Sequence, residues 1–360
     1  MLEFPYIEEK KILKYTFGAT GLALLPEAIF ADETNKKKLA KYTFKFSSPY
    51  KTSDYETTPH AHLEIKQLIE KYTQNNVYVE IRDNGIDGIG SSLVNSVKYN
   101  LTDCALLSVS NLSPIIPELD IINIPFWSAS PEDYIRLFTS DVWKRRVLSK
   151  LEKHNLKLLL PYVVGARTAT STKQFGKRIV TPEDFVDVIF RIPGSINLKY
   201  FYQMTRARPH TIAWRLTAIT ARAGRFQALA PSITGLYSGP DGLRNEIGVI
   251  SEIESVHDGW VAIANKDFIN TLDSKTRIQF LLAWEEIQQA QSKQYENVNK
   301  LCSDKFKKLG TKIYRPSQHD KEVLASTFGH ERAEWDPVKK RLLGEDGLLI
   351  FDGMYKAAKG

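Results

Sequence analysis

The chain has 360 residues, of which 42% are hydrophobic and 25% are charged, and 49 Lys and Arg outnumber 42 Asp and Glu for a formal net charge of +7. This is the composition of an ordinary globular protein, and its length suggests two lobes rather than one small domain. Basic residues do not cluster beyond Lys36-Lys37-Lys38, which argues against a nucleic-acid-binding protein.

The N-terminal residues have features of an export signal. Lys10-Lys11 precede an apolar stretch at 12–25, and Ala28-Ile29-Phe30-Ala31 has the small residues of a cleavage site. The apolar stretch is too short to span a bilayer as a mature helix. We therefore expect residues 1–31 to be a signal peptide and 32–40 to be a polar tether.

Strand and helix patterns alternate through the first half of the chain. Strand patterns lie at 42–46, 77–81 and 104–109, and helical spacing lies at 65–72 and 91–99. This alternation predicts an α/β layer with a mostly parallel sheet. A continuous apolar run at 157–164 is typical of a strand that is buried on both faces.

A second unit begins after residue 164. Its strand patterns lie at 189–192, which ends at Pro193-Gly194, and at 226–229, with helices expected over 195–204 and 214–223. A later apolar segment, 259–264, has the pattern of a strand that could rejoin the first sheet.

One segment predicts an unusually long helix. Residues 273–309 contain neither Gly nor Pro, and apolar residues recur within them at helical spacing. At about 1.5 Å per residue, a helix of roughly thirty residues is about 45 Å long, which is more than one lobe needs. We expect this helix to brace both lobes; a coiled-coil arm is the alternative.

Six short motifs follow one another along the chain: Asn84-Gly85 with Gly88-Ile89-Gly90, Thr102-Asp103-Cys104-Ala105-Leu106 leading to Ser108, Pro117-Glu118-Leu119-Asp120 with Ile124-Pro125-Phe126-Trp127, Gly165-Ala166-Arg167, Thr181-Pro182-Glu183-Asp184, and Phe190-Arg191-Ile192-Pro193-Gly194. The most specific feature is an arginine that ends a strand before Pro-Gly, about 24 residues after the Gly-Ala-Arg. In this order and at this spacing, the motifs resemble those of a known family, the periplasmic solute-binding proteins of tripartite ATP-independent (TRAP) transporters, in the four-carbon-dicarboxylate-binding-protein-like group.

The resemblance implies an α/β, two-lobed, periplasmic-binding-protein-like fold with a long helix that braces both lobes. We expect lobe I to comprise 41–164 plus 252–272, and lobe II to comprise 165–251 plus 273–360. It also implies a monomeric receptor in the periplasm that delivers a small organic carboxylate to TRAP-type membrane permease subunits, without a cofactor and without nucleic acid.

The resemblance also implies the site residues. The family's carboxylate-clamping arginine falls on Arg191, its supporting arginine on Arg167 and its aromatic wall on Trp214, with first-lobe contacts at Ser108 and Asn111. The chemistry agrees, because a guanidinium presents two parallel N–H donors to the two oxygens of a carboxylate. The carboxyl end of a strand at a crevice is also the usual place for a ligand in open α/β sheets.

The sequence departs from the family's pattern at two positions, and both concern the end of the ligand that lies away from the carboxylate bound at Arg191. Pro231 occupies the place of a ligand-binding asparagine of the family and cannot donate, and Arg215 follows Trp214 where the family usually has a glutamate. We therefore expect Ser232, Thr234 or Tyr237 to contact the far end, and we favour a monocarboxylate or 2-oxo acid over a dicarboxylate.

Other functions use the same kind of cleft. A periplasmic ligand sensor for a signalling partner is one alternative, and an enzyme is a weaker one. The sequence has no Gly-x-Ser-x-Gly elbow, phosphate loop or Cys–His motif, so we expect no enzyme. His60-Ala61-His62 lacks further ligands at metal-binding spacing, so we expect no metal site.

Overall fold

The structure is a computed structural model that describes residues 26–360 except 55–61 and 129. The chain divides into two compact units, Met1–Lys38 and Leu39–Gly360. Helix α1 (Pro26–Leu39) shows that most of the expected tether at 32–40 is helical, whereas 1–25 of the expected signal peptide lie outside the described residues. No helix in the described part of the chain has the length and apolar composition of a membrane span.

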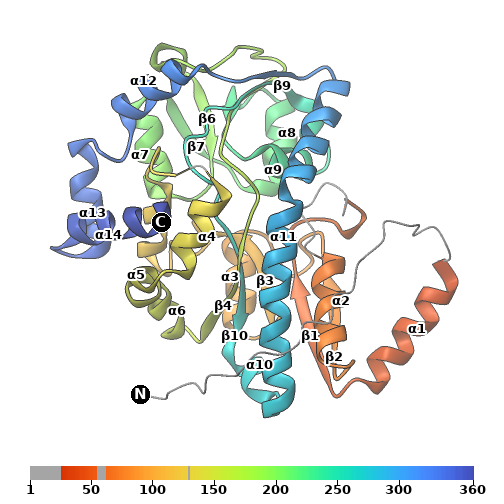
Figure 1. The fold of residues 1–360 in the computed structure, drawn as a ribbon. Coiled ribbons are helices and arrows are strands. Elements are labelled where there is room, and N and C mark those ends of the chain that lie inside the picture. The colour runs from red at the N-terminus through yellow and green to blue at the C-terminus, as the bar shows by residue number, and fades with distance from the viewer. Residues whose placement is uncertain (1–25, 55–61, 129) are drawn as a thin grey trace. The chain divides into compact units, whose positions relative to one another are not determined.

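The first lobe of the larger unit is built on a five-stranded sheet (Figure 1). Its strand order is β2-β1-β3-β10-β4, with β1 parallel to β2 and β3, and β10 antiparallel to β3 and β4. The expectation that 259–264 rejoins this sheet is confirmed. Its strands are β1 (Tyr42–Ser47), β2 (Val77–Arg82), β3 (Cys104–Ser108), β4 (Leu156–Tyr162) and β10 (Trp260–Asn265), and its helices are α2 (His62–Tyr72), α3 (Ser91–Lys98), α4 (Pro131–Thr139), α5 (Asp141–Trp143), α6 (Ser149–Glu152) and α10 (Lys266–Thr271).

The second lobe is built on a six-stranded mixed sheet in the order β11-β9-β5-β8-β6-β7. Strand β6, which carries Arg191, is parallel to both of its neighbours, so its carboxyl end lies beside those of β7 and β8. The strands are β5 (Ala169–Thr172), β6 (Ile189–Ile192), β7 (Arg208–Thr211), β8 (Ala228–Leu229), β9 (Ile247–Ser251) and β11 (Lys312–Tyr314), and the helices are α7 (Ile196–Met204), α8 (Thr217–Arg222), α9 (Ile233–Tyr237) and α12 (Gln318–Phe328).

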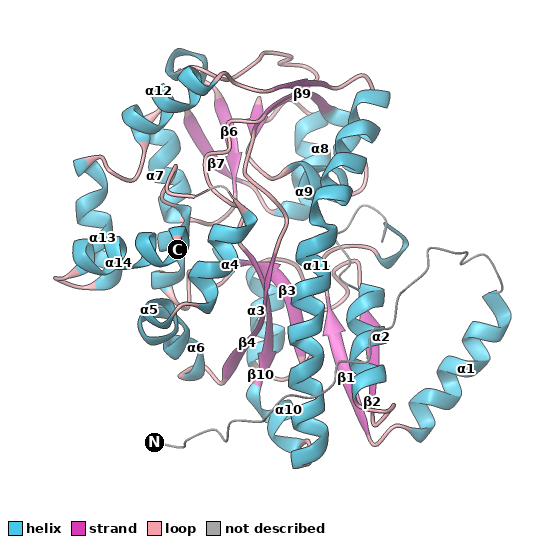
Figure 2. Cartoon of the chain, in the orientation of Figure 1, coloured by secondary structure: helices cyan, strands magenta, loops and turns pink. Residues whose placement is uncertain are grey.

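Helix α11 (Ser274–Lys308) runs along both lobes (Figure 2). Its N-terminal half buries Trp284 and Ile287 in the core of the first lobe, and its C-terminal half buries Val298 and Phe306 in the core of the second. Its 35 residues bury apolar side chains in both places, so the predicted brace is confirmed and the coiled-coil arm is not. Asp273 caps its N-terminus by accepting from the Thr276 amide.

Asp120, in the 3₁₀ segment Pro117–Asn123, ties one lobe to the other. Its carboxylate accepts hydrogen bonds from the Ser195 hydroxyl at 2.6 Å and from the Asn197 amide at 2.9 Å. These two residues begin α7, immediately after the Pro193-Gly194 turn. The acidic end of the Pro117-Glu118-Leu119-Asp120 motif therefore caps the helix that follows the Arg191 strand.

The last two helices of the chain form a pair that packs beside α4. Helix α13 (Asp336–Leu343) and helix α14 (Gly347–Lys359) pack on each other, and α14 packs against α4 of the first lobe. Arg136 donates to the Ala358 carbonyl, and the Lys359 ammonium pairs with the Asp133 carboxylate. The end of the chain is therefore held against α4 by both apolar packing and charged side chains.

Candidate functional site

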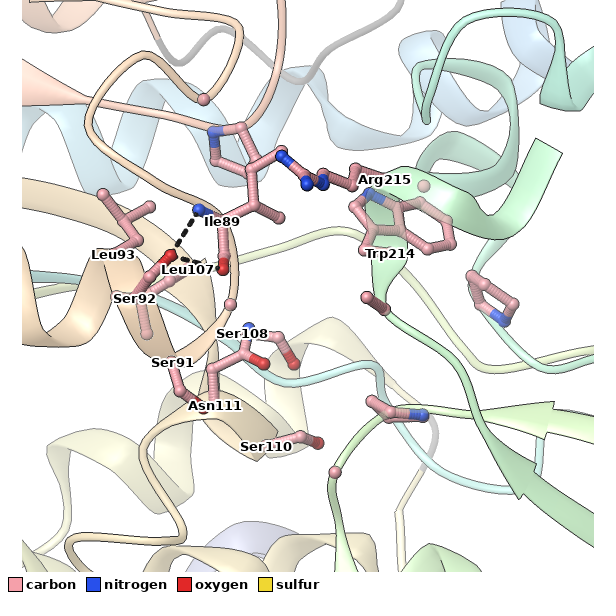
Figure 3. Close-up of a pocket in the computed structure, with 18 of the residues that line it drawn as sticks. Ile89, Ser91, Ser92, Leu93, Leu107, Ser108, Ser110, Asn111, Trp214 and Arg215 are labelled. Atoms are coloured by element: carbon pink, nitrogen blue, oxygen red, sulfur yellow. Dashed lines mark hydrogen bonds between the residues drawn. The ribbon is translucent and has the colours of Figure 1, made fainter. Parts of the chain in front are cut away.

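A cavity of about 560 Å³ lies between the two lobes. Figure 3 shows the polar side chains Ser91, Ser92, Ser108, Ser110 and Asn111 on one side of it, and Trp214 and Arg215 on the other. The first group comes from α3 and from the end of β3, and the second comes from the 3₁₀ turn Trp214–Leu216 after β7. The cavity therefore has a hydroxyl-rich wall that faces an aromatic and cationic wall.

Arg191 lies at the inner part of this cavity with only 5% of its surface exposed. Its Nε and Nη2 donate to the Ile212 carbonyl oxygen at 3.0 and 2.8 Å, which fixes the direction of the side chain. The guanidinium carbon lies 5.0 Å from the centre of the Trp214 ring, within the range of a cation–π contact. Within the described residues, no carboxylate lies within ion-pair distance of Arg191.

Arg167 has a different environment. Its Nη2 lies 2.7 Å from Asp258 Oδ1 in an ion pair with both side chains buried, and its Nη1 donates to the Ala230 carbonyl at 3.4 Å. The Arg167 amide donates to the Val256 carbonyl, so the two segments that carry the pair are held together by the backbone. The charge of Arg167 is thus balanced within the protein.

The charges of these three groups affect one another. Burial, and repulsion from Arg167, lower the pKa of Arg191 to about 9, while the negative charge of Asp258 acts in the opposite direction. Burial raises the pKa of Asp258, against the attraction of Arg167 and Arg191. The buried end of the cavity therefore brings two guanidiniums and one carboxyl group together.

The structure brings five of the six predicted site residues together. Arg191, Arg167, Trp214, Ser108 and Asn111 all line the cavity. Tyr237 does not line it, because its ring packs edge-on against Phe306 of α11 at 5.1 Å and lies under the Arg244 guanidinium at 4.8 Å. Loop composition alone suggested its role.

The other two predicted contacts for the far end of the ligand are used within the fold. The Ser232 hydroxyl caps α9 by accepting from the Gly235 amide, and the Thr234 hydroxyl donates to the Val164 carbonyl at 2.6 Å. Pro231 lines the cavity, and its carbonyl accepts a hydrogen bond from the Thr168 hydroxyl. Both hydroxyls therefore stabilise the local backbone.

Tyr50, Arg215 and Asp258 are among the lining residues that were not predicted as site residues. His257-Asp258 resembles a turn in the sequence, and only the fold brings it to Arg167, 91 positions earlier in the chain. Arg215 is exposed, and Figure 3 shows its side chain extending past Trp214 toward Ile89. In the sequence, Arg215 stands out only because the family usually has a glutamate at this position.

The cavity does not resemble a metal site. Within the described ranges, no group of three or more His, Cys, Asp or Glu side chains is arranged to hold a metal ion. Of the His60-Ala61-His62 sequence, His62 is buried beside Phe46, and His60 lies outside the described residues.

Two α/β lobes with an arginine-lined cavity between them form the kind of crevice in which small ligands bind. The chain belongs to the family of bacterial extracellular solute-binding proteins, family 7, whose model matches residues 50–331. The resemblance to this family is therefore confirmed, and so is the predicted fold class.

Solved structures and curated relatives agree with the family. A TRAP periplasmic solute-binding protein of Haemophilus influenzae with bound L-gulonate has a TM-score of 0.77 at 15% identity and covers 88% of this chain and 99% of its own. One of Pseudomonas aeruginosa with bound L-malate has a TM-score of 0.72 at 20% identity and covers 80% and 97%. A solute-binding protein of Chromohalobacter salexigens is 25% identical over 127 residues, which is 35% of this chain and only 36% of the relative.

Proposed function

We propose that this protein is a periplasmic receptor that binds a small organic carboxylate in the inter-lobe cavity and delivers it to a TRAP-type membrane permease. One observation carries the proposal: Arg191 is a buried cation in a cavity, with no ion-pair partner among the described residues. A buried charge without a partner is costly, so an anion that enters the cavity gains a partner and relieves that cost. The family to which the chain belongs supports the same reading.

The proposed ligand class is small organic acids, without a preference for one kind of acid. The structural neighbours hold L-malate, succinate and L-gulonate, which are dicarboxylates and a sugar acid. They do not support the expected preference for a monocarboxylate or 2-oxo acid. A cavity of about 560 Å³ lies within the usual size range of ligand sites and accommodates either kind of acid.

The proposal includes no chemical step. The titratable side chains that line the cavity are Tyr50, Arg167, Arg191, Arg215 and Asp258. Asp258 is already paired with Arg167, and none of the lining residues in the described part of the chain is His, Cys or Lys. These side chains suit the binding of an anion. Among the described lining residues, they do not include a general base placed next to a nucleophile.

The same proposal includes two further points. Residues 1–31 are a signal peptide that directs export to the periplasm, and the partner of the exported receptor is a membrane permease. Cell fractionation of the tagged full chain, with the N-terminus of the mature protein sequenced, tests the export. Capture of permease subunits by the acid-loaded receptor, compared with the unloaded receptor, tests the delivery.

A thermal-shift screen of organic acids, followed by calorimetry, tests the ligand class. An acid present at 100 times its dissociation constant adds about 2.7 kcal/mol to the free energy of unfolding, which raises Tm by several degrees. We expect one or more mono- or dicarboxylates or sugar acids to raise Tm. If neutral sugars raise Tm and no acid does, the carboxylate proposal is wrong.

A further inference from the structure

Tyr50 is one of the residues that line the cavity. It follows β1 by three residues, and only 2% of its surface is exposed. Its ring lies against the Trp260 ring, with centroids 5.1 Å apart. Its amide donates to the Ser48 hydroxyl and its carbonyl accepts from the Asn84 amide, so the residue is held at both ends.

The hydroxyl of Tyr50 has no hydrogen-bond partner within the described residues. A buried hydroxyl is nearly always paired, because leaving it unpaired costs free energy that a phenylalanine would not. The residue therefore carries a polar atom that the fold itself does not use, at the edge of a cavity.

Two further donors, on arginines that line the cavity, have no partner among the residues that the structure describes. Arg167 Nε is buried and unpaired, and Arg191 uses Nε and Nη2 on Ile212, which leaves Nη1 without a partner in the described part of the chain. Three unused donors on residues that line one cavity favour a ligand that is rich in acceptors. A carboxylate, with two oxygens and about four acceptor positions, is such a ligand.

The Tyr50 hydroxyl lies where the two lobes meet. A Cβ built on Gly235, in α9 of the second lobe, would lie 3.9 Å from Tyr50 Oη, although Tyr50 itself belongs to the first lobe. A ligand oxygen bound here is held from the first lobe, whereas Arg191 holds the ligand from the second. A bond to Tyr50 would therefore join the two lobes through the ligand.

We propose, on the basis of the proposed function, that Tyr50 is a further ligand-binding residue whose hydroxyl donates a hydrogen bond to an oxygen of the acid bound at Arg191. Burial, and then the charge of Asp258, raise the pKa of Tyr50 well above its usual value, so the hydroxyl keeps its proton and acts as a donor. The ligand class that this contact selects is an acid with an acceptor oxygen within reach of the first lobe.

Calorimetry on Tyr50→Phe, with an acid that raises Tm of the wild type, tests the proposal. We expect affinity to fall by about 10- to 100-fold, as for a lost hydrogen bond to a charged group, and the dissociation rate to rise by a similar factor. Tm of the ligand-free variant should be unchanged or higher, because the unpaired hydroxyl is gone.

Tyr202→Phe is the matched control. Tyr202 is also fully buried with a hydroxyl that has no partner in the described residues, but it lies on α7 and does not line the cavity. The affinity of the Tyr202→Phe variant for the acid should stay within twofold of that of the wild type.

The outcomes separate this inference from the proposed function. If the wild type binds an acid and Tyr50→Phe binds it within threefold, the role of Tyr50 is wrong while the receptor function stands. If no acid binds to the wild type, both proposals are wrong. A loss of affinity in Tyr202→Phe equal to that in Tyr50→Phe would also overturn the inference, because the effect would then not depend on the cavity.

Discussion

The side-chain amide of Gln291 makes both backbone hydrogen bonds of Val163. Gln291 Oε1 accepts from the Val163 amide at 3.0 Å, and Gln291 Nε2 donates to the Val163 carbonyl at 2.6 Å. Val163 directly follows β4, where the chain leaves the first lobe, and Gln291 lies in the middle of α11 with 1% of its surface exposed. One side chain thus takes the place of a neighbouring strand at the crossover between the lobes.

Replacing Gln291 by leucine should destabilise the protein strongly. The change leaves a buried amide and a buried carbonyl without partners, at about 1–3 kcal/mol each. We expect the free energy of unfolding in urea to fall by about 2–5 kcal/mol. Gln289→Leu is the control, since Gln289 is exposed on the same helix and should change this energy by less than about 0.5 kcal/mol. Equal effects of the two changes would contradict the role of the amide.

Arg191→Ala should remove acid binding while the unliganded protein stays folded. The variant loses the proposed carboxylate partner, so we expect affinity in calorimetry to fall by at least about 100-fold. Two opposing changes leave stability nearly constant: the Ile212 carbonyl loses its donors, but a buried charge is also removed. Arg191→Lys should bind poorly too, because an ammonium cannot serve both Ile212 and a carboxylate with a planar fork.

Arg208→Ala is the control for this pair of variants. Arg208 lies on β7, which is paired with β6, but it is exposed and pairs with Asp187 at 2.7 Å. Its loss should leave affinity unchanged. A fall in Tm of many degrees in Arg191→Ala would instead indicate that this guanidinium has a mainly structural role.

The order of strands and helices could be predicted from local patterns, because each depends on residues close in sequence. The 273–309 segment predicted α11 through its lack of Gly and Pro, and apolar runs predicted β3 and β10. Arg191 could be singled out because it matches the strand-end arginine before Pro-Gly of the family that the sequence resembles.

Contacts between distant segments could not be predicted in this way. Asp258 acquires its role only through Arg167, and Tyr50 only through the cavity that both lobes form. Tyr237 shows the converse, since a glycine-rich loop pattern suggested a ligand contact but cannot show that Phe306 of α11 packs against the ring. Whether a polar side chain is available to a ligand depends on whether a residue far away in the sequence already binds it, and local patterns do not show this.

His62 should make stability depend on pH in the acidic range. Burial lowers its pKa from the ordinary 6.5 to about 4, although the nearby Asp83 acts in the opposite direction. The unfolded chain therefore takes up the proton more readily than the folded one, so the contribution of His62 is complete above pH 6.5 and is lost as pH falls toward 4. A difference of this size corresponds to about 3 kcal/mol.

Urea unfolding of His62→Gln and the wild type, at pH 7.5 and at pH 4.5, measures this contribution. The variant should lose about 2–3 kcal/mol less than the wild type between the two pH values. His319→Gln is the control because His319 is exposed, and it should follow the wild type. Identical pH dependence in His62→Gln and the wild type would show that other groups, such as carboxylates, account for the acid sensitivity.

The Arg167–Asp258 pair should affect stability and ligand affinity in opposite directions. Asp258→Asn leaves Arg167 as a buried charge without its partner, which costs about 3–5 kcal/mol of stability. Arg167→Met together with Asp258→Asn should cost less than the sum of the single changes, because the double variant buries neither charge.

In the same Asp258→Asn variant the cavity loses its one carboxylate and keeps all of its guanidiniums, so an anionic ligand meets less repulsion. We therefore expect its affinity for the acid to rise by about tenfold, measured by calorimetry at a temperature where the variant is folded. The sign of the change is decisive. A weaker affinity would mean that the Asp258 carboxylate accepts a hydrogen bond from the ligand, for instance from a hydroxyl group, and that its main role is direct recognition rather than balancing the charge of Arg167.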